Sequence, residues 1–223
     1  LPFFMELMTH LVSKGINCPL PVPARDGNIL QELEGRPCAI FSFLDGTSSR
    51  YPSREKCIAL GRCLAALHLN TKGVSRNRKN ALGPASWQPL LDSVGERANE
   101  ISPSMQHMAQ DRLNSILAQW PQNLPRGIIH ADLFPNNVLF IGDELTGVID
   151  FYFACEDIIA YDIAVCLNSW CFEADGSFNL TKSRSLIRNY QAVRPLSEAE
   201  IGAIPILAAG SAMRFFLTRL QDW

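Results

Sequence analysis

The sequence predicts an α+β fold, in which a short part that contains strands is followed by a larger, mainly helical part. Two runs with β-strand composition, residues 28–33 and 37–44, each follow a turn dipeptide. From Tyr51 onward the apolar residues recur mostly at helical spacing. We therefore expect an N-terminal unit of one helix and strands at residues 1–46, and a helical unit at residues 47–223.

Composition excludes several classes of protein. Of the 223 residues, 47% are hydrophobic and 19% are charged, which is typical of globular domains and not of disordered chains. The net charge of -2 argues against binding of nucleic acid through bulk charge. The apolar stretch at residues 201–213 contains Pro205 and is too short and too broken to cross a bilayer, so we expect no membrane partner.

The seven cysteines predict the compartment. Their number is odd and no pair has the C-x-x-C spacing of a zinc or redox site. We expect them to be small, buried thiols in a reducing environment, and hence a cytoplasmic protein.

Apolar periodicity predicts where the helices lie. Residues 2–14 carry a helical stripe that ends at Gly15, in the position of a helix C-cap. Ser197 and Glu200 form a capping box that opens the last helix, and we expect Pro205 to kink or split that helix. Further helices are expected at residues 53–69, 87–94, 105–117 and 158–170.

The stretch that carries chemistry is GIIHADLFPNNVLFIGDELTGVIDFYF, residues 127–153. His130, Asp132 and Asn137 lie in a loop that follows an apolar lead. Two strand-like runs joined by a turn come next, and Asp150 ends the second run. A hairpin of this kind can bring both carboxylates and the carboxamide to one edge.

This set of side chains suits a phosphoryl-transfer site. Carboxylate and amide oxygens are ligands that Mg²⁺ accepts, and phosphate oxygens or waters fill its other positions. Asp132 also has the chemistry to take a proton from a substrate hydroxyl. His130 is either an acid or base, or a support of the loop through hydrogen bonds, and we favour support. An ordinary acidic turn is the alternative for the whole stretch.

The pattern H-x-D-x-x-x-x-N, followed after twelve residues by an Asp, resembles the catalytic and metal-binding loops of protein-kinase-like enzymes. The run HADLFPNN is similar to the H-G-D-x-x-x-x-N loop of the aminoglycoside phosphotransferase superfamily, whose members have the protein-kinase fold but phosphorylate small alcohols. A protein kinase would have Arg at Ala131. Runs such as AYDIAVCLNSWCFEADGSFN resemble the homoserine kinases within that superfamily, and the similarity covers essentially the whole chain.

The resemblance implies a two-lobed, protein-kinase-like fold with a mainly helical C-terminal lobe and most of the N-terminal lobe missing. It implies ATP-dependent phosphorylation of the hydroxyl of L-homoserine, in threonine biosynthesis, with Mg²⁺. By the same resemblance Asp132 is the catalytic base, and Asn137 and Asp150 hold the metal. Asp162 braces the catalytic loop, with a direct part in catalysis as the alternative. Since D-F-G of kinases is here Asp150-Phe151-Tyr152, we do not assume a kinase-like flip of that segment.

The resemblance also implies where the two substrates bind. In the hinge, Ser42 through its C=O and Leu44 through its N–H would contact adenine, unless this run is an edge strand without a ligand. Arg214 lies in an apolar run and is a candidate clamp for the substrate carboxylate, although pairing with a structural Asp or reaching solvent is favoured. Tyr152 and Trp170 are candidates for the pocket wall, with core packing as the alternative.

Two parts of such an enzyme are absent from the sequence. The phosphate-covering loop and the early-strand Lys should come before Leu1, and Glu6 is a candidate for the Glu partner of that Lys. The sequence therefore looks truncated at both ends, as an internal fragment of a protein of ~300 residues, and we expect the fragment to be inactive by itself. The alternatives are a phosphotransferase of the same superfamily that acts on an aminoglycoside or a choline-like amino alcohol, and a non-catalytic binding module. The oligomeric state stays open.

Overall fold

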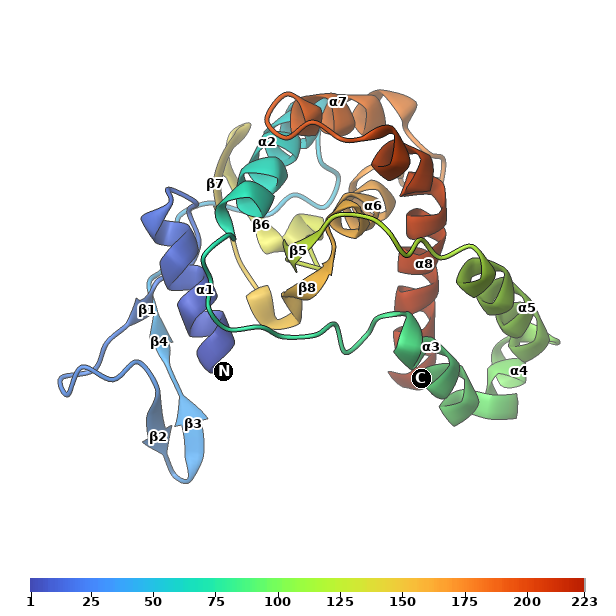
Figure 1. Cartoon of the computed structure of the whole chain (residues 1–223), viewed down its shortest axis with the longest axis horizontal. Coiled ribbons are helices and arrows are strands. Elements are labelled where there is room, and N and C mark those ends of the chain that lie inside the picture. Colours follow the sequence, from blue (N-terminus) through green and yellow to red (C-terminus); the bar gives the residue numbers. More distant parts are fainter. Residues whose placement is uncertain (223) are drawn as a thin grey trace.

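The structure, a computed structural model, describes residues 1–222 (Figure 1). Figure 1 shows α1 and a group of short strands at one side of a larger body, in which α6 lies among the other helices. This arrangement matches the expected order of a strand-containing part and a mainly helical part. The helices of the larger body are α2 (Arg54–Asn70), α3 (Pro84–Val94), α4 (Ala98–Ile101), α5 (Met105–Ala118), α6 (Ile159–Trp170), α7 (Leu180–Gln191) and α8 (Glu198–Asp222).

The N-terminal part consists of one helix and two antiparallel strand pairs. Helix α1 (Pro2–Ser13) buries the expected apolar stripe, and Gly15 after it has φ +81. Glu34 and Gly35 have φ values of 51 and 74, the backbone of a tight hairpin turn, which confirms the turn signal there. The pairs are β2 (Gln31–Leu33) with β3 (Arg36–Cys38), and β1 (Pro21–Val22) with β4 (Ile40–Phe41). Strand β1 was not expected, and the predicted run 37–44 is interrupted at Ala39.

Two further antiparallel pairs flank the loop of interest. Strands β6 (Val138–Ile141) and β7 (Glu144–Val148) form the predicted hairpin. Strands β5 (Arg126–Ile129) and β8 (Cys155–Ile158) form a second pair that the sequence did not predict. Thr47 bridges to Phe140 of β6, so the segment that was expected to separate the two parts is itself anchored on the hairpin.

The helices begin where local chemistry predicts. The Ser53 hydroxyl accepts the Lys56 N–H at 3.1 Å and caps α2. Ser197 and Glu200 make the reciprocal bonds of a capping box at the start of α8. Helix α6 is buried on almost every side and contacts α2, α7 and α8.

The expectation that Pro205 splits the last helix is wrong. Helix α8 runs for 25 residues without a break. Pro205 and Ile201 are both exposed, so water can hydrate the carbonyl that the proline leaves without a donor. The continuous helix is long and apolar enough, by length and composition alone, to cross a membrane. It packs here against α3, α5 and α6, as a core helix does.

Candidate active site

Asp132 lies in the loop that joins β5 to β6, and the backbone before it is strained. Ala131 has φ +64, in the left-handed region that costs a residue with a side chain about 1–2 kcal/mol. The Asp162 carboxylate holds this conformation because it accepts the N–H of His130 at 2.7 Å and that of Ala131 at 2.8 Å.

Asp162 joins this loop to two helices. Its fully buried carboxylate also lies 3.1 Å from Nε2 of His68 on α2, and Nδ1 of His68 lies 2.7 Å from the Tyr190 hydroxyl on α7. Burial alone would raise the pKa of Asp162, but the hydrogen bonds from His68 and the backbone hold that pKa below its ordinary value. The bracing role of Asp162 stays a prediction, and this geometry is compatible with it. His68 and Tyr190 were not predicted, because nothing in the motif points to helices so distant in the chain.

The ring of His130 makes hydrogen bonds to the backbone on both sides of the loop. Its ring is fully buried, and Nε2 lies 3.0 Å from the Ile149 carbonyl, so Nε2 is the nitrogen that donates. Nδ1 then accepts the Asp132 N–H at 3.3 Å. Burial lowers the pKa of His130 and keeps the ring neutral, although nearby carboxylates oppose the effect. The arrangement fits the support role and leaves no ring nitrogen free for proton transfer.

The Asp132 carboxylate is partly open, with 17% of the side chain exposed. The Asn137 side-chain amide donates to the Asp132 carbonyl at 2.7 Å and to Oδ2 at 3.2 Å. Oδ1 lies 4.0 Å from Nη2 of Arg214. Burial raises the pKa of Asp132 above its ordinary value, against the opposing charge of Arg214.

Asn137 and Asp150 lie next to each other. The Ile149 N–H donates to the Asn137 carbonyl at 2.9 Å, and Asp150 follows directly with φ +61 and an exposed side chain. The amide NH₂ group of Asn137 faces Asp132, and within residues 1–222 the side-chain oxygen of Asn137 has no hydrogen-bond partner. One carboxamide and one exposed carboxylate oxygen fit Mg²⁺, provided that phosphate or water fills the other positions. No group of three or more His, Cys, Asp or Glu side chains among these residues forms a complete metal cage.

Arg214 reaches the loop from α8. Its guanidinium is buried, Nη1 donates to the Ala131 carbonyl, and the group stacks over the rings of Phe215 at 4.5 Å and Phe153 at 5.2 Å. The carboxylate nearest to Arg214 is that of Asp132, the predicted base, and not that of a structural Asp, and the side chain does not reach solvent.

The two aromatic candidates for the pocket wall differ. Tyr152 is exposed and stacks on Phe4 with ring centroids 5.9 Å apart, so it remains available to a ligand. Trp170 is fully buried and its Nε1 donates to the Leu133 carbonyl at 2.8 Å. Trp170 therefore supports the loop from the core and does not line a pocket here, which is the alternative that the sequence left open.

The hinge residues lie beside the hairpin. The Ser42 N–H donates to the Leu20 carbonyl at 2.9 Å. Among residues 1–222 no hydrogen bond engages the Ser42 carbonyl or the Leu44 N–H, the two groups expected to contact adenine. Leu44 packs so closely on Gly147 of β7 that an added Cβ there would lie 2.6 Å from it. The hinge and the strand that leads toward Asp150 are thus in direct contact.

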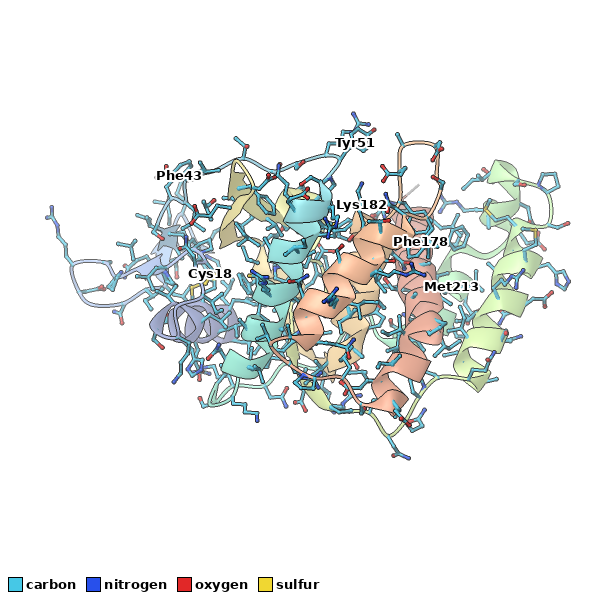
Figure 2. All side chains as sticks on the ribbon, turned by 90° about the horizontal axis from the view of Figure 1, so that it is seen from above. Cys18, Phe43, Tyr51, Phe178, Lys182 and Met213 are labelled. Carbon is cyan, nitrogen blue, oxygen red and sulfur yellow. The ribbon has the colours of Figure 1, made fainter. Side chains whose placement is uncertain are left out.

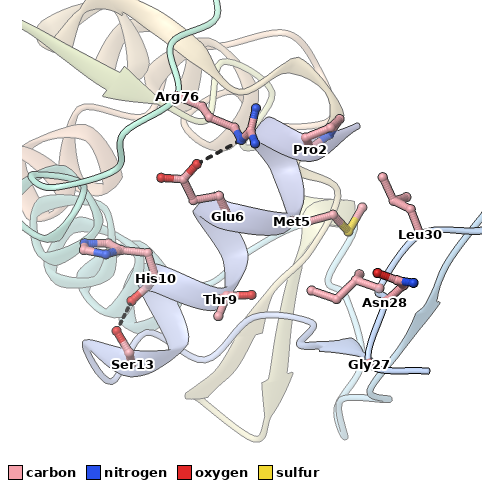
Figure 3. A pocket seen from close by; sticks show the side chains of 11 residues that line it. Pro2, Met5, Glu6, Thr9, His10, Ser13, Gly27, Asn28, Leu30 and Arg76 are labelled. Carbon is pink, nitrogen blue, oxygen red and sulfur yellow. Dashed lines mark hydrogen bonds and ion pairs between the residues drawn. The ribbon is translucent and has the colours of Figure 1, made fainter. Parts of the chain in front are cut away.

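A separate pocket of about 750 Å³ lies between α1 and residues 27–30 (Figure 3). Figure 3 shows Glu6 on one side of it, where its carboxylate pairs with Arg76 at 3.3 Å and also accepts the Ser75 N–H. The hydrogen bonds from Ser75, and to a lesser extent the contact with Arg76, lower the pKa of Glu6. Glu6, the candidate partner of an N-terminal Lys, is therefore held by the loop after α2.

Comparison with known proteins gives consistent matches along the chain. The profile of a family described as phosphotransferase enzymes matches residues 1–196. The homoserine kinase of Agrobacterium fabrum is 53% identical over 223 residues, which are all of this chain and 69% of that protein. The homoserine kinase of Azorhizobium caulinodans is 54% identical and is covered to 70%. The chain thus spans about 70% of the length of these curated relatives, in keeping with the expectation of a shortened sequence.

Solved structures show the same fold at low identity. Amicoumacin kinase, in a complex with AMP-PNP, Ca²⁺ and Ami, aligns over 100% of this chain and 70% of its own, with a TM-score of 0.77 and 18% identity. Spectinomycin phosphotransferase with ADP and spectinomycin aligns over 99% of this chain and 72% of its own, with a TM-score of 0.74 and 14% identity. These likenesses confirm the predicted phosphotransferase fold, with its helical C-terminal lobe and reduced N-terminal lobe.

Proposed function

The chain belongs to the phosphotransferase enzyme family, and on this premise we propose that it transfers a phosphoryl group from ATP to the hydroxyl of L-homoserine, a step of threonine biosynthesis. The observation that carries the proposal is the convergence of Asp132, Asn137 and Asp150 at the ends of one hairpin. The choice of substrate is supported by relatives with 52–54% identity that are named homoserine kinase. We assign the enzyme to the cytoplasm, whose reducing conditions keep cysteines as thiols.

In this proposal Asp132 orients the acceptor hydroxyl and takes its proton as the phosphoryl group is transferred. The carboxylate must be ionised for that task. Arg214 favours the ionised form, since a positive charge about 4 Å away offsets part of the burial penalty. The neutral ring of His130 fixes the Asp132 backbone without competing for the proton.

Asn137 and Asp150 would hold Mg²⁺ through their side-chain oxygens, and the bound ion would neutralise charge that develops on the nucleotide phosphates. Adenine would bind to the hinge, at the Ser42 carbonyl and the Leu44 N–H. Because its guanidinium already contacts the Ala131 carbonyl, we assign Arg214 to the loop and not to the carboxylate of homoserine. Tyr152 remains a candidate for the wall of the acceptor site.

The test is a coupled assay of ADP release, on the protein expressed at the length of its curated relatives. We expect turnover with L-homoserine and none with an aminoglycoside or choline. Asp132→Ala should reduce kcat at least a hundredfold, because the proton acceptor is lost, and should leave nucleotide binding nearly unchanged. Asp143→Ala, at the exposed turn of the same hairpin, is the matched control and should keep full activity.

Turnover with another alcohol but not with homoserine would overturn the substrate, while leaving the phosphotransferase assignment in place. Loss of both turnover and nucleotide binding in Asp132→Ala would show that this residue maintains the fold of the site and is not its base.

A further inference from the structure

A groove between α2 and α7, on the outside of the helical body, is lined by four arginines. Figure 2 shows the two helices side by side along one surface, with Lys182 at the start of α7. Arg54 and Arg62 come from α2, and Arg184 and Arg188 come from α7, around a volume of about 580 Å³. The other lining residues are uncharged: Ile58, Thr181, Ser185 and Asn189.

The two arginines of α2 are held in place by neutral partners. Nε of Arg54 donates to the Ser185 hydroxyl at 3.1 Å, and Nε of Arg62 donates to the Asn189 side-chain oxygen at 3.0 Å. Both bonds use the inner nitrogen of the guanidinium, so the two outer NH₂ groups remain to bind another molecule. Glu55 lies 3.9 Å from Arg54, but both side chains are more than half exposed and such a pair is weak.

The two arginines of α7 carry charge without a counterpart. They lie four residues apart on an exposed helix face, where like charges destabilise the helix. In the part of the chain that the structure describes, neither Arg184 nor Arg188 has an ion pair, whereas the neighbouring Lys182 is paired with Glu173 at 2.8 Å. The chain as a whole is slightly acidic, so this concentration of positive charge does not follow from composition.

The spacing of the four groups is fixed by the close approach of the helices. At Gly61 of α2 an added Cβ would lie 2.4 Å from the Leu186 carbonyl of α7, so the two backbones are in contact. The four arginine side chains therefore project from two helices whose relative position is fixed.

We propose that this groove binds a small anion that carries two or more linked phosphate groups. Guanidinium NH₂ groups match phosphate oxygens in paired, charge-assisted hydrogen bonds, and arginine is better suited to this than lysine. The volume is that of an ordinary small-molecule site. The groove is built from residues of α2 and α7 only, so the proposal does not depend on the chemistry of Asp132.

The experiment is isothermal titration of the chain with inorganic tripolyphosphate, at low ionic strength and with a chelator, so that no divalent ion supports phosphate binding near Asp150. We expect one site. Arg184→Gln with Arg188→Gln should weaken binding about tenfold or more, because two charge-assisted donors are lost. The matched control, Arg97→Gln with Arg112→Gln, removes the same charge from two exposed arginines elsewhere and should bind as the unchanged chain does.

Arg184→Lys with Arg188→Lys keeps the charge but removes the planar donors, and should lose an intermediate amount of affinity. No binding, or equal losses in the groove variant and the control, would overturn the proposal. Citrate that binds as tightly as tripolyphosphate would overturn the preference for phosphate. All variants alter exposed helix residues, and thermal unfolding checks that each one folds.

Discussion

Arg214 connects helix α8 to the loop that carries Asp132. The guanidinium is only 2% exposed, so its charge and its donors need partners. Nη1 donates to the Ala131 carbonyl, Nη2 lies 4.0 Å from the Asp132 carboxylate and two aromatic rings cover the group, while within residues 1–222 Nε has no hydrogen-bond partner. Arg214 thereby ties α8 to the strained residue before the proposed base.

We expect Arg214→Met to move the acid limb of the kcat/KM profile to higher pH. Asp132 must be ionised to accept a proton, burial already raises its pKa, and removal of the nearby positive charge raises that pKa further. Arg214→Lys keeps the charge and should shift the limb less. Arg219→Met, an exposed arginine on the same helix, is the control. A profile that is lower at every pH but unshifted would show that Arg214 acts only through packing.

At this scale the sequence predicted the parts of the site that lie in one continuous segment. The spacing from His130 to Asn137 and on to Asp150 indicates a loop and a hairpin, and local geometry then brings these side chains together. The partners of Asp162 could not be found in this way. His68 lies 94 residues from Asp162, and only the tertiary packing of α2 on α6 joins them.

At the scale of elements, strong apolar periodicity predicted helices well, and charged or polar segments were missed. Strand β8 contains Glu156 and Asp157, so it shows no alternation. Asp157 is buried, and its carboxylate is paired with Arg126 at 3.1 Å and Asn80 at 2.6 Å. Helix α7 was also missed, because its sequence LTKSRSLIRNYQ is mostly polar and its buried face is narrow.

Two glycines within helices should respond in opposite ways to substitution by alanine, because one lies at the contact of α2 with α7 and the other faces open space. Gly61→Ala would place a Cβ 2.4 Å from the Leu186 carbonyl and force the helices apart, at a cost of about 1–3 kcal/mol in the free energy of unfolding. Gly202→Ala in α8 meets nothing within 4 Å and should stabilise the fold by about 0.5–1 kcal/mol, since alanine favours a helix. Urea unfolding of the two variants measures both signs. A neutral Gly61→Ala would mean that the helices can separate freely.

At the scale of the whole molecule, Asp162 lies where the loop, α2 and α6 meet. One carboxylate receives two backbone N–H groups and a histidine from separate elements. Its ionisation is therefore coupled to the packing of the helical body and to the geometry of the proposed base together.

This coupling predicts how stability depends on pH. The pKa of His130 in the folded state lies below its ordinary value of 6.5. On acidification the unfolded chain therefore binds a proton at His130 before the folded chain does. Stability should therefore begin to fall as the pH drops below about 6.5. The pKa of Asp162 lies below 3.8, so its contribution is complete above that pH and is lost as the pH falls through the lower, folded-state value.

Asp162→Asn isolates the contribution of the ionised Asp162 carboxylate to stability. At pH 7 the variant should lose about 3 kcal/mol, because an amide cannot accept from all the donors that face the carboxylate. Below pH 3.8 the unchanged protein loses the same interaction, so the difference between the two urea midpoints should narrow. Asp143→Asn, at an exposed turn, should follow the unchanged protein at every pH. A difference that stays constant down to pH 3 would contradict the assignment, because it would show that the three donors stabilise Asp162 without depending on its charge.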